Sequence, residues 1–252
     1  MNMLKCFSIG LILTAAMGTP TQVQAQDESK TLTKGQKSVA GSDAKKEKDD
    51  GGVRMGKAMH GTPVIDGKID DIWKNVPPLM TDREVESDNS LTDGQTVSRA
   101  SVKCLWDKDH LYCLAEVKDD KISVASSDDW DQDSVEFFID ENMSKKSSYD
   151  DDDAQYRTTA EGVETHGSST NGDSYNSKVT KVEGGYIVEA SIKLKTEAGK
   201  KIGFDAQVNN DPGTGSRGSI AKWNDATNDT FESLAGVGVL ELVDASGSEF
   251  VE

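Results

Sequence analysis

The stretch W-D-Q-D-S-V-E-F-F-I-D-E-N-M-S-K-K-S-S-Y-D-D-D-D-A-Q-Y-R, residues 130–157, decides the fold. Its segment 134–140 is rich in apolar and aromatic side chains, which predicts a buried or half-buried strand. Four consecutive aspartates follow, and a second strand-like segment begins at residues 154–157. The two segments are therefore predicted to form a β-hairpin with a long acidic loop.

The hairpin carries polar side chains that could form a ligand site. Glu136, Gln155 and Arg157 lie on its strands, and Trp130 stands in the acidic loop just before it. An ordinary hairpin with a solvated acidic loop accounts for the same residues, and composition alone favours this simpler interpretation.

Short strand-like segments continue along the chain, and turn residues separate them. They cover residues 100–106, 111–118, 178–182, 185–192, 201–209, 219–223 and 238–242. No stretch has a long helical period. Many short strands with Gly, Asn and Asp between them predict an all-β protein, namely an antiparallel β-sandwich of jelly-roll or immunoglobulin-like type.

The segments that precede these strands are less regular. Residues 64–65 read as a short strand, and residues 70–73 as a short helical turn with acidic residues near its start. Trp73 and Trp223 are expected in the core because of their apolar surroundings. The polar residues 81–96 are expected to form a surface excursion.

Composition divides the chain into four parts. Residues 1–25 combine a basic start, an apolar run at 7–17 and a small-x-small end, which is typical of a secretory signal peptide. The apolar run is too short to span a membrane, so we expect secretion to an extracellular location. Residues 26–52 are polar and predict a disordered, flexible linker. A single folded domain is expected at 53–243, with a C-terminal tail at 244–252.

The charge balance argues against several partners. The chain has 45 acidic and 28 basic residues and a formal net charge of −17. An acidic surface repels phosphate, so we expect neither nucleic acid nor an anionic membrane as a partner. Acidic loops outside the cell suit calcium, although such runs also occur as purely solvated surface.

Two cysteines remain after the expected processing. Residues 102–106 and 111–117 are strand-like and are joined by a polar turn at 107–110, so Cys104 falls opposite Cys113 in the predicted hairpin. Directly opposed side chains are close enough for a disulfide, and a secreted protein permits oxidation. The alternative is a pair of small thiols that face the core. We expect the disulfide.

No constellation for nucleophilic catalysis is present in the sequence. The three histidines, His60, His110 and His166, lie in turn-like contexts without the spacing of a metal site or triad. A carboxylate pair that includes Glu136 is the one remaining route to catalysis, which would make the protein a glycoside hydrolase. Because acidic residues are abundant, this signal has little specificity.

The alternative hypothesis is that the protein binds a sugar without cleaving it. A sugar ring has apolar faces and a rim of hydroxyl groups, so a fitting site supplies aromatic faces and a few fixed polar groups. Trp130 and Phe231 both stand in polar, turn-rich loops, where a core role is harder to supply.

Seven segments together resemble a known family. They are G-T-P-V-I-D-G-K-I-D-D-I-W (61–73), L-W-D-K-D-H-L-Y (105–112), W-D-Q-D-S-V-E-F-F-I-D-E-N (130–142), Y-D-D-D-D-A-Q-Y-R (149–157), G-G-Y-I-V-E-A-S-I-K (184–193), I-G-F-D-A-Q-V-N-N-D (202–211) and W-N-D-A-T-N-D-T-F (223–231). The chain resembles the family 9 carbohydrate-binding modules, which are appended to secreted bacterial xylanases. The resemblance implies a β-sandwich that binds sugar without cleaving it.

The resemblance also implies a ligand and a site. Members of the family hold the reducing ends of cellulose or xylan chains, and soluble sugars, between two stacked aromatic rings, and so serve carbohydrate catabolism. By position, the two rings and the hydrogen-bonding groups are Trp130, Phe231, Glu136, Arg157, Gln207 and Asn228. The family normally has tryptophan where this chain has Phe231. Because phenylalanine offers a smaller face and no N–H, we expect weaker stacking or a changed specificity.

Further expectations follow from the same resemblance. The family binds structural calcium, and Asp119 is the ligand that the resemblance places best, with the acidic loops as further candidates. A linked or separate glycoside hydrolase is an expected partner. Two alternatives stay open, which are a hydrolase acting on xylan and a cell-surface structural sandwich whose sugar site has decayed.

Overall fold

The computed structural model describes residues 52–244, and these residues form thirteen β-strands and six short 3-10 helices. No α-helix occurs within this range, so the predicted all-β class is confirmed. None of the helices in the described range is long and apolar enough to cross a membrane. The predicted signal peptide (1–25), nearly all of the linker (26–52) and all but the first residue of the tail (244–252) lie outside the described residues.

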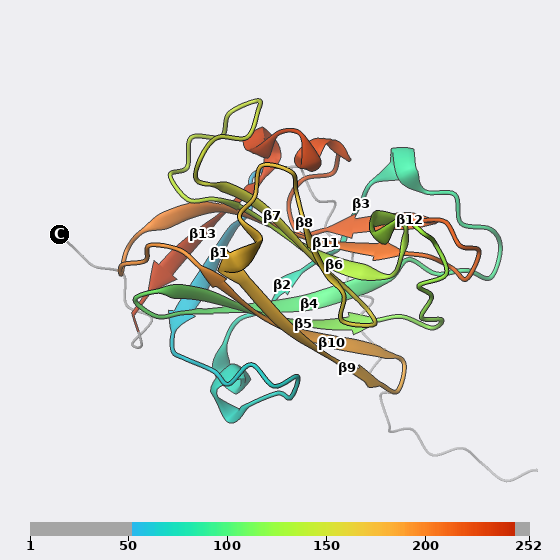
Figure 1. The fold of residues 1–252 in the computed structure, drawn as a ribbon, viewed down its shortest axis with the longest axis horizontal. Helices are drawn as coiled ribbons and strands as arrows, with labels where there is room; N and C mark the ends of the chain where they lie inside the picture. Colours follow the sequence, from blue (N-terminus) through green and yellow to red (C-terminus); the bar gives the residue numbers. More distant parts are fainter. Residues whose placement is uncertain (1–51, 245–252) are drawn as a thin grey trace, which may run out of the picture. The chain divides into compact units, whose positions relative to one another are not determined.

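The strands follow the order of the chain as labelled in Figure 1. They are β1 (Met55–His60), β2 (Leu79–Met80), β3 (Arg83–Glu84), β4 (Arg99–Trp106), β5 (His110–Lys118), β6 (Ser134–Asp140), β7 (Asp153–Thr159), β8 (Glu164–His166), β9 (Tyr175–Val182), β10 (Gly185–Lys193), β11 (Lys201–Asn210), β12 (Ser219–Lys222) and β13 (Gly238–Val243). The 3-10 helices are η1 (Asp71–Asn75), η2 (Glu86–Asp88), η3 (Asp129–Asp131), η4 (Gly172–Ser174), η5 (Asp229–Phe231) and η6 (Leu234–Gly236).

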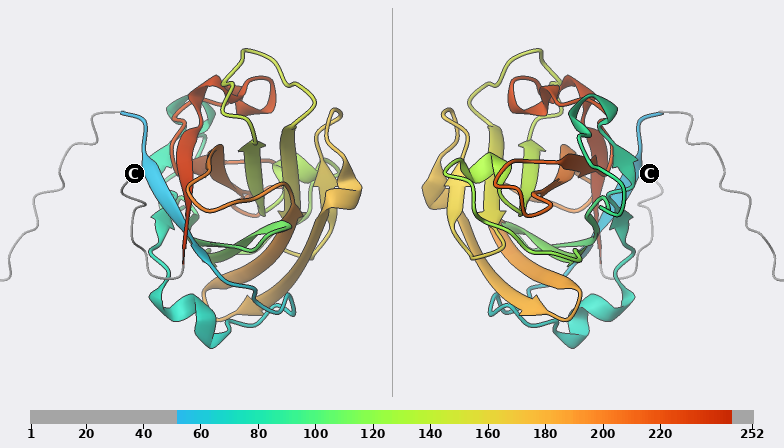
Figure 2. Two further views of the ribbon diagram at one scale, coloured as in Figure 1. Left: turned by 90° about the vertical axis from the view of Figure 1, so that its left-hand side faces the viewer. Right: turned by 90° about the vertical axis from the view of Figure 1, so that its right-hand side faces the viewer.

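The strands form one continuous sheet that curls over on itself. Its order is β8-β7-β6-β11-β13-β1-β4-β5-β10-β9, and β12 attaches to β11 and β3. The two ends of this path come to lie in facing layers, which gives a nearly closed, sandwich-like barrel (Figures 1 and 2). A single large apolar cluster with side chains from both layers fills the space between them.

The predicted antiparallel arrangement is wrong for one strand. Among the described strands, β1 pairs in parallel with both of its neighbours, β13 and β4, and every other pairing is antiparallel. The sequence pattern missed this strand because it buries small residues, Gly56 and Ala58. A Cβ at Gly56 would lie 2.7 Å from Leu79 Cδ2, so a larger residue here would have to displace the Leu79 side chain. The strand predicted at 64–65 is instead an irregular connection.

The side chains of β6 point alternately to the two faces of the sheet, and both faces are buried, which explains the consecutive apolar residues 137–139. Val135, Phe137 and Ile139 point into the core between the layers. The intervening Glu136 and Phe138 point to the opposite face of the sheet, where they are also buried. Both faces of β6 are therefore covered, the inner one by the core and the outer one by loops.

The segments before β4 match the predictions in part. The helical turn expected at 70–73 is η1, and Trp73 is fully buried as expected, with its indole N–H donating to Glu189 Oε1 at 3.1 Å. Trp223 is also a core residue, at 3% exposure. The excursion predicted at 81–96 is less irregular than expected, because it contains β3, which pairs with β12.

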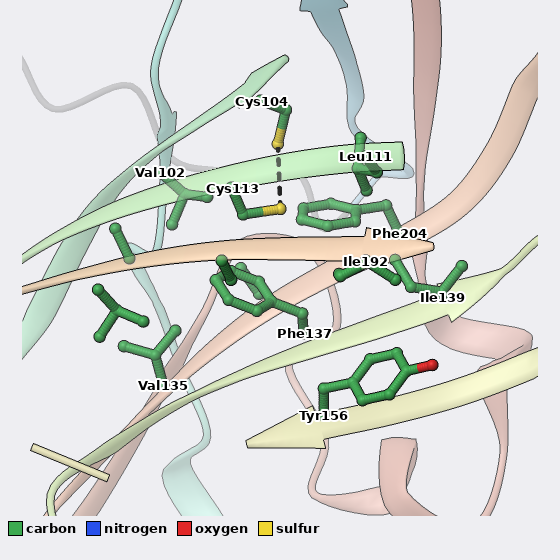
Figure 3. Close-up of a cluster of buried hydrophobic side chains, with 14 of the residues drawn as sticks. Val102, Cys104, Leu111, Cys113, Val135, Phe137, Ile139, Tyr156, Ile192 and Phe204 are labelled. Atoms are coloured by element: carbon green, nitrogen blue, oxygen red, sulfur yellow. Dashed lines mark hydrogen bonds between the residues drawn. The ribbon is translucent and has the colours of Figure 1, made fainter. Parts of the chain in front are cut away.

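The register of the β4–β5 hairpin is as predicted, with Cys104 directly opposite Cys113. Asp107 N donates to His110 O, so the alternation of the ladder makes the cysteines a non-hydrogen-bonded pair, in which side chains approach most closely. The predicted disulfide is nevertheless wrong. Both residues are free thiols with their sulfur atoms 3.9 Å apart, against about 2.05 Å for a disulfide bond (Figure 3).

Burial gives the physical reason for two stable thiols. Both side chains are fully buried within the core cluster, where a thiol packs as a small apolar group. Burial, together with the contact to Cys104, raises the pKa of the Cys113 thiol well above its ordinary value. The thiolate is the form that reacts, so oxidation is disfavoured in the folded protein.

We expect Cys104 and Cys113 to resist iodoacetamide in the native protein and to take one label each after unfolding in urea without reductant. Peptide mass mapping separates their labels from that of Cys6. Recovery of a disulfide-linked peptide pair from the unfolded protein would contradict the structure.

Candidate functional site

Three neighbouring strands carry a row of polar side chains on the outer face of the sheet. Glu136 on β6 lies directly opposite Arg157 on β7 and, on its other side, opposite Gln207 on β11. The residues that alternate with them face the core. Register and the two-residue period of a strand therefore bring three of the predicted site residues together.

Loops surround this row of polar side chains and form the sides of a cavity of about 480 Å³. All six residues predicted for the sugar site line this one cavity. The full lining is Asp129, Trp130, Glu136, Phe138, Gln155, Arg157, Thr165, His166, Gly167, Gln207, Arg217, Asn228 and Phe231. Asp119 lines a different cavity, of about 110 Å³.

The two aromatic residues at the rim are exposed. Trp130 in η3 has 50% of its surface accessible, and Phe231 in η5 has 54%. Both project from loops into the same cavity. Large aromatic rings left in solvent beside a fixed polar floor indicate a binding surface.

Glu136 is the organising group of the polar floor. Its buried carboxylate accepts hydrogen bonds from Gln155 Nε2 at 2.6 Å, Arg157 Nε at 2.9 Å and Asn209 Nδ2 at 2.7 Å. Gln207 Nε2 is a more distant donor at 3.4 Å. The carboxylate thus fixes the side chains around it and has little surface of its own to offer a ligand.

The electrostatics of Glu136 follow from these contacts. Burial by itself raises the pKa of its carboxyl group, but the charge of Arg157 and the hydrogen bonds from Gln155, Arg157 and Asn209 outweigh burial, so the pKa lies below its ordinary value. Glu136 is consequently ionised at neutral pH. A group in this state suits a binding site, whereas a glycosidase general acid needs a raised pKa.

Arg157 and Gln207 are fixed by hydrogen bonds to the protein and still have donors or acceptors left for a ligand. Arg157 Nη1 donates to Thr165 Oγ1 at 3.1 Å, which fixes the guanidinium at a second point. Gln207 Nε2 donates to Asn209 Oδ1 at 2.8 Å, and this leaves the amide oxygen of Gln207 as an acceptor. Preorganised donors and acceptors of this kind can bind hydroxyl groups without paying again for their ordering.

A polar bridge connects the loops on which the two aromatic residues stand. Arg217 Nη1 donates to the backbone oxygen of Trp130 at 3.4 Å, and its Nη2 donates to Asp88 Oδ1 at 3.4 Å. The same Asp88 oxygen accepts from Asn228 Nδ2 at 3.2 Å. Through Asp88, therefore, the loop of η3 is tied to the segment that leads to Phe231.

A buried lysine also anchors the segment that leads to Phe231. Lys222 lies in line with Gln207 in the next strand, is fully buried, and donates from Nζ to Thr227 O at 2.9 Å and to Thr230 Oγ1. Asp225 Oδ2 lies 3.7 Å from the ammonium group and accepts from Thr230 Oγ1 at 2.7 Å. These contacts hold the backbone on which Phe231 stands.

Sequence reasoning missed several of these residues. Gln155 was among the polar residues named on the predicted hairpin, but Asn209 was missed, although it lies two positions from Gln207 on the same strand face. No sequence signal pointed to Asp88, Arg217 or Lys222, because only the folded chain brings their segments to the cavity.

The site predicted for calcium lies at the end of β5. Asp119 is buried, its Oδ1 accepts from Lys121 N at 2.8 Å, and its Oδ2 has no hydrogen-bond partner within residues 52–244. Burial, together with the neighbouring charge of Asp119, raises the pKa of Asp133 to about 8. An unpartnered buried oxygen beside a second carboxylate fits a hard cation such as calcium.

Fold and cavity together define a binding domain for a small ligand that has both apolar and polar faces. The family described as carbohydrate family 9 binding domain-like matches residues 65–245, and the chain belongs to this family. The resemblance seen in the sequence is thereby confirmed.

Known relatives agree with this assignment. Endo-1,4-beta-xylanase A of Thermotoga neapolitana is 42% identical over 195 residues, which cover 76% of this chain and 18% of the xylanase. A family 9 carbohydrate-binding module from Caldicellulosiruptor kristjanssonii, solved in complex with cellotriose, superposes with a TM-score of 0.70 at 32% identity over 79% of this chain and 98% of that one. The same module is known in complex with glucose. The match spans less than a fifth of the xylanase.

We expect Glu136→Gln to lower the free energy of unfolding by about 3 kcal/mol at neutral pH, because it leaves the buried Arg157 guanidinium without its counter-charge. Urea unfolding followed by fluorescence measures the change. Glu161→Gln, which breaks the exposed pair with Lys181, is the matched control and should have little effect. Equal stability of Glu136→Gln and the wild type would contradict the organising role.

The stability gap between wild type and Glu136→Gln should depend on pH. Because folding lowers the pKa of Glu136, its contribution is present above the unfolded value, about pH 4.3, and is lost as the pH falls through the folded value. Unfolding curves at falling pH should therefore converge below about pH 4.3. Curves that keep their separation into strong acid would show that the carboxylate charge does not matter.

Proposed function

We propose that this domain binds carbohydrate without cleaving it, with a sugar ring held between Trp130 and Phe231. The observation that carries the proposal is the pair of exposed aromatic residues at the rim of one cavity whose floor holds a buried, hydrogen-bonded ion pair. The aromatic faces cover the apolar C–H surfaces of the sugar, and the floor meets its hydroxyl groups.

Some polar residues of the site contact the sugar directly, and others hold these residues in position. Arg157, Gln207 and Asn228 line the cavity and bind hydroxyl groups. Glu136 stands behind them, and its ion pair with Arg157 aims the guanidinium. Hydrogen bonds from an ionised donor are stronger than neutral ones, so Arg157 supplies the leading polar contact.

The ligand class is the reducing ends of cellulose or xylan chains, together with soluble sugars. The complexes of the Caldicellulosiruptor module with cellotriose and with glucose support β-linked glucose units as ligands. A site for one or a few sugar rings has modest affinity, on the order of micromolar at best.

The domain acts in secreted polysaccharide breakdown, together with a linked or separate glycoside hydrolase. The xylanase relatives support this setting, since the matched region is a small part of each of them. The signal-peptide pattern of residues 1–25 supports export. We also propose that Asp119, with its unpartnered buried oxygen, helps to hold a structural calcium ion.

We expect Trp130→Ala to weaken cellobiose binding by at least about tenfold, a loss of about 1.4 kcal/mol, while the fold stays intact. Removing the indole takes away one of the two stacking faces. Isothermal titration calorimetry measures the affinity, and circular dichroism checks the fold. Val182→Ala, which shortens an exposed side chain outside the cavity, is the control. Unchanged affinity in Trp130→Ala would remove the stacking assignment.

We expect Phe231→Trp to tighten binding on the order of fivefold, because the indole offers roughly one more kilocalorie per mole of apolar contact than the phenyl ring. The same calorimetric titration, with glucose, cellobiose and xylobiose, tests this. An unchanged or weaker affinity for all three sugars would count against Phe231 as a stacking residue. Release of reducing sugar from xylan by the wild type would instead establish a hydrolase.

A further inference from the structure

A second cavity lies next to the proposed sugar site and has a similar volume, about 490 Å³ against about 480 Å³. Gln155, Gly167 and Phe231 line both cavities, so these three residues stand between them. Cavities of roughly 300–1,000 Å³ have the size that holds a small ligand. The second cavity is also lined by Ser148, Tyr149, Ser168, Ser169 and Glu232.

Three segments that are distant in the sequence form the second cavity, and hydrogen bonds hold them together. The loop between β6 and β7 lies beside η5 (Figures 1 and 2), and Tyr149 OH donates to Thr230 O at 2.8 Å. The segment after β8 is joined to β7, because Gly167 N donates to Gln155 O at 3.0 Å. The walls of the cavity are therefore fixed to one another through their backbones.

Phe231 offers apolar surface to both cavities. Its side chain is 54% exposed, and no other aromatic ring within residues 52–244 stacks on it. A hydrogen bond from Ser233 Oγ to Lys146 O at 3.2 Å helps to fix the backbone beside it. A ring that stands between two cavities has one face for each. The proposed function uses only the face toward Trp130.

The polar groups of the second cavity are available to a ligand. The hydroxyl groups of Ser148, Ser168 and Ser169 make no hydrogen bond within residues 52–244, and the carboxylate of Glu232 accepts none there. All four residues are exposed. A serine hydroxyl can both donate and accept, as the hydroxyl groups of a sugar do. The hydroxyl group of Tyr149 is already bonded, so this residue contributes only its ring.

Charge narrows the class of ligand. Among the described residues that line the second cavity, Glu232 alone carries a charge. Its carboxylate repels anionic ligands such as uronic acids and phosphates. The main cavity differs, because two guanidinium groups, those of Arg157 and Arg217, line it. A neutral, polyhydroxylated ligand with an apolar face therefore fits the second cavity best, and a neutral sugar ring has these properties.

We propose that the second cavity is a separate binding site for a neutral sugar, which stacks on the face of Phe231 turned away from Trp130. The proposal rests on the proposed function, because the same ring closes the main site. The second site has one stacking face and serine side chains without internal hydrogen bonds, whereas the main site has two faces and preordered polar groups. Because less preorganisation costs affinity, the second site binds at least about tenfold more weakly.

The two sites are separated by titrating glucose into the isotope-labelled full chain and following backbone amide signals by heteronuclear NMR. We expect the signals of Trp130 and Gln207 to follow one saturation curve, and those of Ser168 and Ser169 to follow a second one, at least about tenfold weaker. In Trp130→Ala, the first curve should be lost and the second should remain.

Three outcomes of this titration would overturn the second site. They are no response of Ser168 and Ser169, one curve shared by all four signals, and loss of the Ser168 and Ser169 response in Trp130→Ala. A response of Ser168 and Ser169 without any response of Trp130 and Gln207 would instead refute the proposed function and leave the second site standing.

Substitutions in the lining test the assignment further. Ser168→Leu replaces a hydroxyl group by a bulky apolar side chain, so it should weaken the second curve by at least about tenfold and leave the first unchanged. The matched control is Ser147→Leu, at an exposed serine of the β6–β7 loop outside both linings, which should change neither curve. Circular dichroism checks that both variants are folded. A second curve equal to that of the wild type in Ser168→Leu would overturn the assignment.

The charge of Glu232 gives an independent test with a second probe. Glucuronate should bind the second site more weakly than glucose does, and Glu232→Gln should remove this difference. Tighter binding of glucuronate than of glucose at Ser168 and Ser169 would show that the cavity does not select a neutral sugar.

Discussion

The buried ion pair between Glu136 and Arg157 is the contact on which the rest of the site depends. Two charges removed from water are tolerated only when further hydrogen bonds offset their lost hydration, and Gln155, Asn209 and Thr165 contribute such bonds. The pair sits at the centre of three strands whose inner faces form the core. A rigid sheet thus fixes the polar floor, and only the rim is built from loops.

Polar contacts to the backbone of the rim loops explain how the two aromatic rings are held in place while they stay exposed. Arg217 and Asp88 connect the loop of Trp130 with Asn228. Lys222 anchors the backbone beside Phe231 from below. The loop between β6 and β7 supports the same backbone from the side. Each exposed ring is therefore oriented by contacts to its backbone, so the ring faces are left for a ligand.

Much of the fold could be predicted from the sequence, because the central strands have strong apolar patterns. Residues 134–140 were predicted with the bounds that the structure has. The missed β1 buries glycine and alanine, which leave no apolar signal, and its parallel pairing depends on distant strands. The cysteine register was predictable from turn length, but the state of the sulfur atoms was not. The residues alone drew attention to Trp130, Glu136, Gln155, Arg157 and Phe231, and the resemblance added Gln207 and Asn228. Asp88, Arg217 and Lys222 reach the site only through long-range folding.

A crystal structure of the domain with bound glucose tests the central claim most directly. We expect a sugar ring stacked between the indole of Trp130 and the phenyl ring of Phe231, with at least one hydroxyl group hydrogen-bonded to Arg157. The ion pair of Arg157 with Glu136 should stay intact beneath the sugar. A sugar bound at another surface while this cavity holds only water would contradict the account.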